Sequence, residues 1–546
     1  MKQSFLKIKK YILWMDQVSV NIKKHLIAGT LFGIAKVIFD LIFILQSKHM
    51  IDIATKTVEG DLWKEAYILV TIILTSLILS AINSYLYTQA ENLMKNRLRE
   101  RLFTHLMIAP MYKRGTYHSG DLTARLEEDV RIVTSNLIAS LPSVVITGSQ
   151  FIGAFWMLMK FDSHFTWIIV AVLPVFMITG KILSLRLRKM TKDIRNDESK
   201  IQSQIQEGLQ HSSLFRALET ETLVRNKFCA LQNQVYRKIM KRTRFTLTSR
   251  STLSLGFITG YLIAFLWGCF NLSKGMISFG VMTAFLQLVG KIQGPTIQLA
   301  QLIPGFIHAT TSVDRLLEIE SFKTETIAAK TLVKGIPGVR LENVEYTYPE
   351  ENHPIFKAFS YDFPPGSHTA IIGPTGTGKT TLIRLILALV QPEKGHVYIY
   401  NENERYSISP ATRCNISYVP QGNSLLSGTI KENLMITNPQ ATQEEIEKVL
   451  HVAVADFVFD LPEGLETMCG ERGMGLSEGQ AQRIAIARGL LKPASVLLLD
   501  EISASLDQET EALLFKRLND YLYEKTFILI THRPHAAIYC NQSLQL

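Results

Sequence analysis

The chain has 546 residues, more than one compact hydrophobic core usually supports, so at least two domains are expected. Hydrophobic residues make up 47% of the sequence, and their excess lies in the first 310 residues, which separates an apolar half from a more polar half. The formal charge of +10 does not indicate nucleic-acid binding, because the basic residues are concentrated in the segments that connect apolar stretches.

The N-terminal segment, residues 1–24, is basic and has its aromatic and aliphatic side chains at helical spacing, as at Phe5, Ile8, Tyr11 and Trp14. It contains no clear cleavage site of small residues. The pattern therefore predicts an amphipathic helix on the membrane surface rather than a signal peptide.

Residues 25–317 contain six apolar stretches, each near the ~20 residues that cross the hydrocarbon core of a membrane. They are 26–46, 66–87, 136–159, 165–184, 253–272 and 279–303. The long segments after the second and fourth stretches are rich in Lys and Arg, whereas the short connections 160–164 and 273–278 carry only Lys160 and Lys274. This bias predicts a multi-pass protein in the lipid bilayer of the cytoplasmic (inner) membrane, with both termini in the cytoplasm.

The two long basic segments, about 88–135 and 185–252, have helical periodicity, so the spans are expected to continue as helices into the cytoplasm. Lys36 and Asp40 lie in the middle of the first apolar stretch, where charged side chains are costly. They are expected to face a bundle interior or a water-filled cavity. Whether they line a translocation path, or form a structural pair with each other or with another helix, stays open.

The polar, turn-rich residues 318–338 are predicted to be a linker, and residues 339–546 alternate short apolar strands with helices. The fold class expected is therefore multidomain: an all-α transmembrane domain of six helices, followed by an α/β domain, which the phosphate-binding motif described next makes an α/β P-loop ATPase domain.

A phosphate-binding loop follows the apolar run 369–372 and opens into a helical pattern. Its glycines allow backbone N–H groups to surround phosphate oxygens, Lys379 can reach the β- and γ-phosphates, and Thr380 can bind Mg²⁺. The predicted ATP-binding residues of this loop are Gly373, Pro374, Thr375, Gly376, Thr377, Gly378, Lys379, Thr380 and Thr381. The context of strand, loop and helix is the one that this motif requires.

A second chemical feature is the apolar run 496–499, which ends in Asp500 and Glu501. Ligands bind at the carboxyl ends of parallel strands, so Asp500 is predicted to hold Mg²⁺ and Glu501 to act as the general base on the hydrolytic water.

Together with Leu476-Ser477-Glu478-Gly479-Gln480, these motifs stand in the order found in the ATP-binding cassette (ABC) family, and the chain resembles its exporter-type members. The resemblance implies that Tyr348 stacks on adenine (Tyr346 is the alternative), that Gln421 contacts Mg²⁺ or the water, and that His532 contacts the γ-phosphate. It also implies that Ser477, Gly479 and Gln480 bind ATP held by an opposite cassette, and that Asp507 lies in a loop at the dimer interface. Segments 117–122 and 213–217 resemble the coupling helices, and 469–473 resembles the loop that contacts them.

Two features depart from the family pattern. Residues 476–480 correspond to the signature motif of the family, and Glu478 replaces the usual middle glycine of this signature. Either its side chain points away from the phosphate or the ATP site is weakened. Residues 536–546 leave room for one short helix and one strand after His532, which puts the terminal dimer contacts of the cassette in doubt.

The function predicted is ATP-driven, Mg²⁺-dependent export of an unidentified substrate by a dimer of half-transporters, with a homodimer favoured and a heterodimer possible. The alternatives are a catalytically weakened subunit of a heterodimer and, less favoured, a non-transport ABC ATPase. No nucleic-acid partner is expected. The residues do not indicate whether the cargo is a drug, a lipid or a peptide.

Overall fold

The structure is a computed structural model of the whole chain, and it describes residues 11, 13–20, 22–109, 119–326, 328–348, 353–470 and 475–546. The chain divides into two compact units. The first comprises Met1–Phe103 and Leu122–Glu320, and the second comprises Thr104–Asp121 and Ser321–Leu546.

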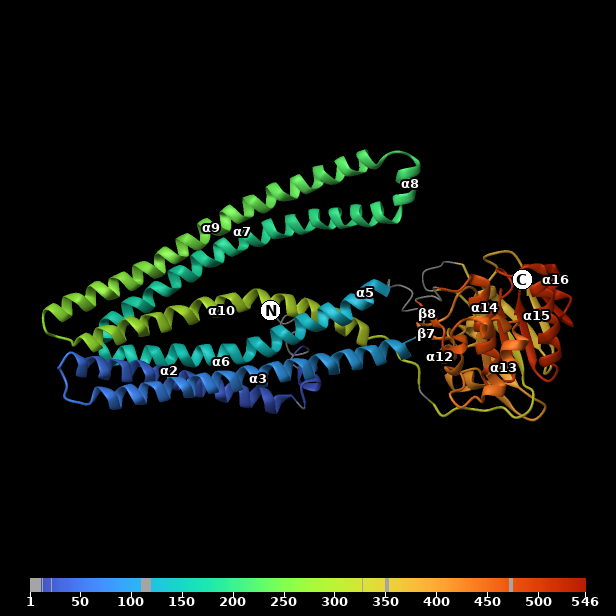
Figure 1. Cartoon of the computed structure of the whole chain (residues 1–546), viewed down its shortest axis with the longest axis horizontal. Helices are drawn as coiled ribbons and strands as arrows, with labels where there is room; N and C mark the ends of the chain where they lie inside the picture. Colours follow the sequence, from blue (N-terminus) through green and yellow to red (C-terminus); the bar gives the residue numbers. More distant parts are fainter. Residues whose placement is uncertain are drawn as a thin grey trace. The chain divides into compact units, whose positions relative to one another are not determined.

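The described part of the first unit is helical and is built from six long helices (Figure 1). They are α2 (Lys23–Ala54), α3 (Leu62–Ile108), α6 (Val130–Phe161), α7 (Ser163–Gln210), α9 (Glu221–Ser273) and α10 (Phe279–Glu320). Within the described residues, four stretches are long and apolar enough to cross a membrane: Lys23–Ala54, Leu62–Ile108, Pro142–Phe161 and Glu221–Ser273. The remaining predicted stretches, 165–184 and 279–303, lie in α7 and α10, whose side chains are only partly described. The prediction of a helical transmembrane domain is confirmed.

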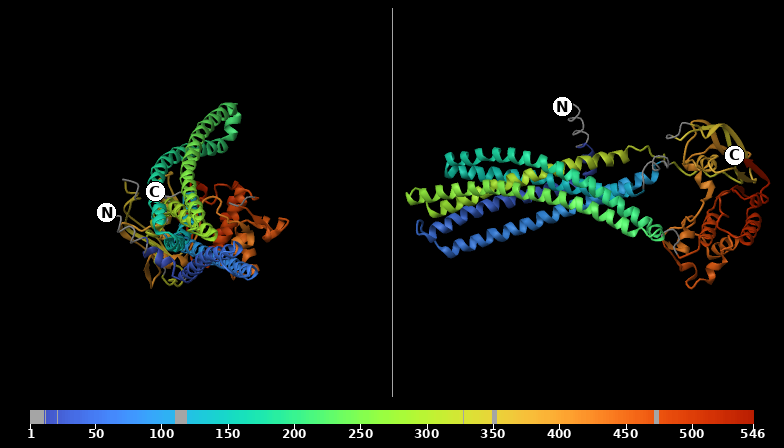
Figure 2. Two further views of the ribbon diagram at one scale, coloured as in Figure 1. Left: turned by 90° about the vertical axis from the view of Figure 1, so that its left-hand side faces the viewer. Right: turned by 90° about the horizontal axis from the view of Figure 1, so that it is seen from above.

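The helices α7 and α9 run side by side far beyond the apolar stretches, and the short helix α8 (Ser212–Ala217) joins them at one end (Figures 1 and 2). The segment 213–217, predicted to be a coupling helix, is this helix. Of the other predicted coupling segment, residues 119–122 begin α5 (Ser119–Ala124), while Tyr117 and His118 lie outside the described residues. Their contact with an ATPase domain stays a prediction.

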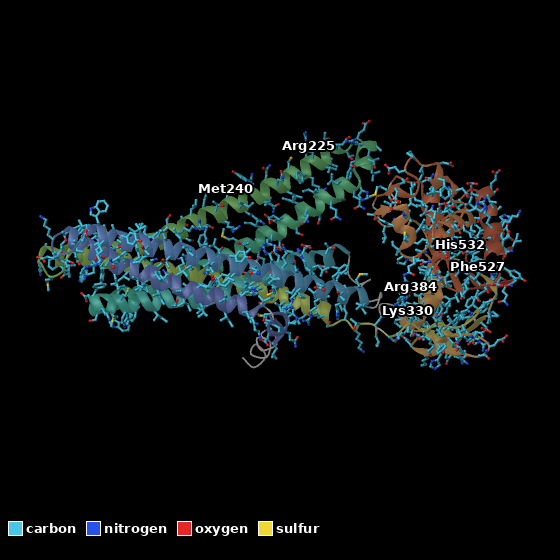
Figure 3. All side chains as sticks on the ribbon, turned by 60° about the horizontal axis from the view of Figure 1, so that its bottom comes forward. Arg225, Met240, Lys330, Arg384, Phe527 and His532 are labelled. Atoms are coloured by element: carbon cyan, nitrogen blue, oxygen red, sulfur yellow. The ribbon has the colours of Figure 1, made fainter. Side chains whose placement is uncertain are left out.

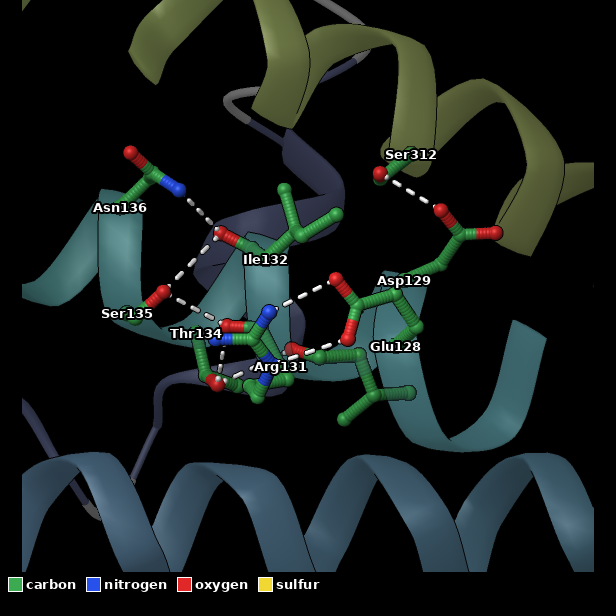
Figure 4. A network of polar contacts seen from close by, with 9 residues as sticks. Glu128, Asp129, Arg131, Ile132, Thr134, Ser135, Asn136 and Ser312 are labelled. Atoms are coloured by element: carbon green, nitrogen blue, oxygen red, sulfur yellow. Dashed lines mark hydrogen bonds and ion pairs between the residues drawn. The ribbon is translucent and has the colours of Figure 1, made fainter. Parts of the chain in front are cut away.

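Charged and polar side chains hold the start of α6 against the end of α10. The π-helix η1 (Arg125–Asp129) precedes α6, and the Asp129 carboxylate accepts a hydrogen bond of 2.7 Å from the Ser312 hydroxyl (Figure 4). Arg125 donates to the Glu318 carboxylate at 2.7 Å, and Arg315 lies 3.5 Å from Asp129. Because Arg125 and Asp129 are buried, these pairings satisfy charges that would otherwise be costly.

The described part of the N-terminal segment is also attached to α10. The Tyr11 hydroxyl donates to Asp314 at 2.7 Å, and the Trp14 indole N–H donates to Glu320 at 2.8 Å. Trp14 is only 5% exposed. This aromatic side chain therefore packs against protein, which differs from the expectation of an aromatic face lying on the membrane surface; residues 1–10 lie outside the described part.

The second unit has an α/β fold, as predicted, and its larger sheet is parallel with the order β11-β3-β10-β9-β6. Its strands are β3 (His368–Ile372), β6 (Ile416–Val419), β9 (Val496–Asp500), β10 (Thr526–Ile530) and β11 (Gln542–Gln545). All residues of β9 and β10 are buried, as expected for central strands covered on both faces. The second sheet is antiparallel, with the order β2-β1-β4-β5, and a small sheet pairs β7 with β8.

The remaining strands are β1 (Gly338–Tyr346), β2 (Phe356–Phe363), β4 (Lys394–Tyr400), β5 (Arg405–Ser407), β7 (Gly428–Thr429) and β8 (Met468–Cys469). The helices are α11 (Lys379–Ile386), α12 (Ile430–Met435), α13 (Gln443–Val452), α14 (Glu478–Leu491), α15 (Gln508–Tyr521) and α16 (Pro534–Ala537). Short 3₁₀ turns are η2 (Pro410–Asn415), η3 (Asp456–Asp460) and η4 (Gly464–Glu466). After His532 the chain forms α16 and β11, which are the one short helix and one strand expected there.

Candidate functional site

The phosphate-binding loop, residues 373–378, connects β3 to α11 at the carboxyl end of the parallel sheet. Gly376 and Gly378 have φ angles of +92° and +99°, a backbone conformation that favours glycine. At Gly378 a Cβ atom would also come within 2.7 Å of Ile355. The loop conformation therefore requires these glycines, and the loop leads directly into the N-terminus of α11, where the first backbone N–H groups have no partner within the helix and can bind an anion.

Lys379 is buried, and its ammonium donates hydrogen bonds to the backbone carbonyls of Gly373 at 2.7 Å and Pro374 at 2.9 Å. An ammonium group has three donors, so one remains for a phosphate oxygen. The side chain is thus held over the loop by the loop itself.

Three side chains from neighbouring strand ends meet in the site, with the Glu501 carboxylate between the side chains of Gln421 and His532. One carboxylate oxygen lies 2.6 Å from Nε2 of His532, and the other accepts a hydrogen bond of 2.7 Å from the Gln421 amide. Glu501 follows β9, His532 follows β10 and Gln421 follows β6, and these strands are adjacent in the sheet. Figure 3 marks His532 in the second unit. The structure thus brings together three residues that were predicted separately, although their catalytic roles stay predictions.

Glu501 also has a constrained backbone. Its φ is +49°, uncommon for a residue other than glycine, and its N–H donates to the carbonyl of Ile530 at 3.0 Å. Strained backbone of this kind occurs often at functional sites, where surrounding contacts hold it in place.

Asp500 ends β9 and is buried, with the Tyr418 hydroxyl donating to its carboxylate at 3.3 Å. Burial raises the pKa of Asp500, and the neighbouring Glu501 raises it further. Within the described residues, no cluster of three His, Cys, Asp or Glu side chains could bind a metal by itself. Thr380, Gln421 and Asp500 supply oxygen donors, and Mg²⁺ is typically held by one or two protein oxygens together with substrate phosphates, so this donor set fits the ion.

Burial distinguishes the two tyrosines that could stack on adenine. Tyr346 is 5% exposed and belongs to the hydrophobic core, so its ring has no free face for a base. Tyr348 is half-buried, and its hydroxyl is 2.7 Å from an Arg384 nitrogen and 3.2 Å from the Thr381 hydroxyl. This geometry favours Tyr348, the residue that the family resemblance implied.

The signature residues form the N-terminus of α14. Ser477 caps this helix: its hydroxyl accepts from the Gln480 N–H at 3.2 Å, and the Gln480 side chain accepts from the Ser477 N–H at 2.9 Å. Glu478 follows the cap and is exposed. A Cβ atom on Gly479 would lie 2.9 Å from the Ser505 carbonyl, so the signature packs directly on the loop before Asp507.

Asp507 caps α15, where its carboxylate accepts hydrogen bonds from the Thr510 N–H at 2.9 Å and from the Thr510 hydroxyl at 2.8 Å. These hydrogen bonds lower the pKa of Asp507. Its side chain is therefore engaged within its own chain, and its predicted place at a dimer interface stays a prediction. In the segment 469–473, which is predicted to contact the coupling helices, Glu471, Arg472 and Gly473 lie outside the described residues.

Two side chains near the site were not predicted from the sequence. Arg384 binds the Tyr348 hydroxyl, and Tyr418 binds Asp500. Arg384 follows Thr381 by three residues in α11, so helical periodicity places the two on the same face, which was an available signal. Tyr418 has no comparable signal, because its contact depends on the alignment of β6 with β9.

A helical membrane domain followed by an α/β domain, with a phosphate-binding loop and acidic residues at the strand ends, defines a membrane-bound P-loop ATPase. Two family models match: "ABC transporter transmembrane region" over residues 26–296 and "ABC transporter" over residues 356–504. The chain belongs to the ABC transporter family. A non-transport ABC ATPase, the less favoured alternative, does not agree with the match to the transmembrane region.

Curated relatives include exporters with different cargoes. The chain is 30% identical, over 80% of its length and 73% of the relative's, to the ATP-dependent lipid A-core flippase of Pseudomonas fluorescens. It is 29% identical, over 82% of its length and 77% of the relative's, to the probable multidrug resistance ABC transporter ATP-binding/permease protein YheI of Bacillus subtilis. It is 28% identical, over 85% of its length and 66% of the relative's, to the leukotoxin export ATP-binding protein LtxB of Aggregatibacter actinomycetemcomitans.

The architecture and the relatives establish the function at the level of class. The chain is an integral membrane ATPase that binds nucleotide and couples ATP hydrolysis to export of a substrate. Exporters with one transmembrane domain and one ATP-binding domain per chain generally act as dimers in the membrane.

Proposed function

We propose that this chain is one half of a homodimeric exporter of the cytoplasmic membrane, with its ATPase domain in the cytoplasm. Two arguments support this orientation and composition. The Lys- and Arg-rich segments between the apolar stretches favour the cytoplasmic side. A single chain also carries every predicted catalytic residue as well as the signature. In a dimer of two copies, the phosphate-binding loop of each copy would therefore be completed by the signature of the other.

The observation that carries the mechanism is the Glu501 carboxylate, which is held between Gln421 and His532. A carboxylate has about four acceptor positions, and these two contacts use two of them. The free positions can accept a proton from a water molecule placed in line with the γ-phosphate, so Glu501 acts as the general base. His532 and Gln421 position its carboxylate and can each contact the phosphate or the water.

The remaining residues bind and neutralise the nucleotide. The loop N–H groups and Lys379 surround the phosphates, Tyr348 stacks on adenine, and Thr380, Asp500 and Gln421 would hold Mg²⁺, whose charge neutralises phosphate oxygens. Ser477, Gly479 and Gln480 of the second copy complete the site from the opposite side. Because phosphoryl transfer depends mainly on positioning and charge neutralisation, joining the two halves would switch hydrolysis on.

The test is Glu501→Gln in the full chain, reconstituted in lipid nanodiscs. Turnover should fall by about 10²-fold or more, since general-base catalysis typically contributes 10²- to 10⁴-fold, while ATP binding persists. The matched control is Glu524→Gln, which removes an exposed carboxylate from a turn outside the site. Substantial ATP turnover in the Glu501 variant would refute the assignment.

A second candidate, a catalytically weakened subunit of a heterodimer, is favoured by Glu478 alone. This carboxylate lies at the helix end that should approach the phosphate. ATPase activity of the purified chain decides between the two. Hydrolysis that begins only after a different half-transporter is added would refute the homodimer.

A further inference from the structure

Charged side chains are rare within the six apolar stretches, and three of them lie at the same depth. The stretches contain Lys36, Asp40, Lys181 and Lys291. Lys181 is close to the end of its stretch, where a lysine can extend its ammonium toward the membrane surface. Lys36 is the midpoint of 26–46 and Lys291 the midpoint of 279–303, so both are placed near the centre of the bilayer.

The structure brings these central charges together from different helices. One oxygen of the Asp40 carboxylate lies 3.2 Å from the Lys36 ammonium and 3.4 Å from the Lys291 ammonium. The other oxygen accepts a hydrogen bond of 2.8 Å from the Ser76 hydroxyl, and Ser76 is at the centre of the stretch 66–87. Three helices, α2, α3 and α10, thus contribute polar groups to one cluster in the membrane.

This cluster contains two ammonium groups and one carboxylate, so it carries one more positive charge than a balanced ion pair. Asp40 is the only acidic residue in the six apolar stretches. Its single negative charge balances one of the two positive charges and leaves the other unbalanced. A second copy of the chain would bring the same excess rather than a counterion. Because charges at the bilayer centre are expensive and usually functional, two lysines that share a single carboxylate indicate an anionic ligand for the remaining positive charge.

The cluster also borders a polar helix face rather than a lipid-facing one. Lys291 shares one stripe of α10 with Gln287, four residues earlier, and Gln298, seven residues later, and both glutamines are exposed. On α2 and α3 the exposed positions next to the cluster include large apolar side chains instead, as at Ile38 and Leu77. The side chains of Lys36 and Lys291 are 35% and 34% exposed, so an incoming group can reach them.

We propose that the exported substrate is an anionic amphiphile whose negative group binds Lys36 and Lys291 at mid-depth in the membrane. This inference rests on the proposed export function and adds the class of cargo. Asp40 holds the two ammonium groups side by side and leaves one net positive charge, which attracts an anionic group such as a carboxylate or a phosphate monoester. Because the cluster lies at the centre of apolar, membrane-spanning stretches, the anion has to be carried by an apolar body to reach it.

The experiment measures ATPase stimulation of the full chain in phosphatidylcholine nanodiscs by two probes with the same acyl chain. Oleoyl lysophosphatidic acid carries a net negative charge, and oleoyl lysophosphatidylcholine does not. The anionic probe should reach half-maximal stimulation at a concentration about tenfold lower. In Lys291→Met this preference should fall by about tenfold, which corresponds to about 1.4 kcal/mol.

Further variants separate charge from packing. Lys291→Arg should keep the preference, and Asp40→Asn should strengthen it, because it raises the positive excess. Lys274→Met, in the turn between α9 and α10, removes a lysine outside the apolar stretches and should change nothing.

Four results would overturn the inference: equal responses of the unmodified chain to both probes, no response to either, an unchanged preference in Lys291→Met, or stimulation by inorganic phosphate alone. The failure of the proposed function is a separate result, because it would appear as ATP turnover that survives Glu501→Gln.

Discussion

Glu478 offers the sharpest quantitative test of the paired ATP site. Its carboxylate is exposed at the first residue of α14, next to the capping Ser477. At a helix N-terminus a negative side chain stabilises the helix by about 0.3–1 kcal/mol. If this helix end approaches the γ-phosphate of the opposite cassette, as proposed, the same charge opposes ATP-driven closure. Glu478→Gln should therefore have two effects of opposite sign.

The size of the second effect follows from Coulomb's law. At about 4 Å, two unit charges repel by about 1 kcal/mol in bulk water and by about 4 kcal/mol at an effective dielectric constant of about 20. Because Glu478 is exposed, the lower figure applies, and about 1 kcal/mol corresponds to roughly a fivefold change in binding. The half-maximal ATP concentration for hydrolysis should therefore fall about fivefold, while the free energy of unfolding falls by less than about 1 kcal/mol.

The assay is ATPase rate against ATP concentration at two ionic strengths, with thermal unfolding measured in parallel. Screening shortens from about 10 Å at 0.1 M salt to about 3 Å at 1 M, so the advantage of the variant should shrink as salt rises. Glu509→Gln, in the first turn of α15, is the control for a lost carboxylate at a helix N-terminus. An unchanged half-maximal ATP concentration, or a gain that does not depend on salt, would refute the placement of Glu478 near a phosphate.

Two further predictions concern packing in the second unit. Gly479→Ala should lower ATPase activity without unfolding the chain, because its Cβ would lie 2.9 Å from the Ser505 carbonyl and displace the signature; activity equal to the unmodified chain would contradict this. Arg413→Met should lower the free energy of unfolding by about 2 kcal/mol, because it leaves the partly buried Glu325 carboxylate without its two hydrogen bonds of 2.7 and 2.8 Å; this lies between the cost of breaking an exposed pair and that of breaking a fully buried one. Arg405→Met, which breaks an exposed pair, should cost under about 1 kcal/mol in the same thermal unfolding measurement, and equal losses would contradict the argument.

The sequence predicted those parts of the site that depend on local geometry. The phosphate-binding loop is local, because its glycines, its lysine and the following helix are contiguous. The meeting of Gln421, Glu501 and His532 was also predictable, since each follows an apolar run and parallel strands end at one edge of a sheet. Tyr348 was preferred over Tyr346 by resemblance to the family, and the burial of Tyr346 gives the physical reason.

Long-range pairing could not be predicted in the same way. The sequence placed Lys36 and Asp40 on one helix face, but Lys291 is 251 residues from Asp40, and nothing local joins them. Trp14 was expected on a membrane surface because periodicity shows only that a face is apolar; in the structure Trp14 is buried, and Glu320 of α10 accepts its indole N–H. Both cases depend on which helices pack together, and that information is distributed over the whole chain.

The charges at the two proposed sites act on one equilibrium. Closing a homodimer would bring two Glu478 carboxylates toward phosphates and two positively charged clusters into one membrane bundle, and both steps would be electrostatically unfavourable. An anionic cargo neutralises the excess at Lys36 and Lys291 and would therefore favour closure, whereas ATP alone must overcome the repulsion from Glu478. On these proposals the chain hydrolyses ATP slowly until cargo binds. Removing the carboxylate of Glu478 should then raise the ATPase rate measured without cargo more than the rate measured with cargo. Such a difference is expected if charge couples the two sites without a direct contact between them.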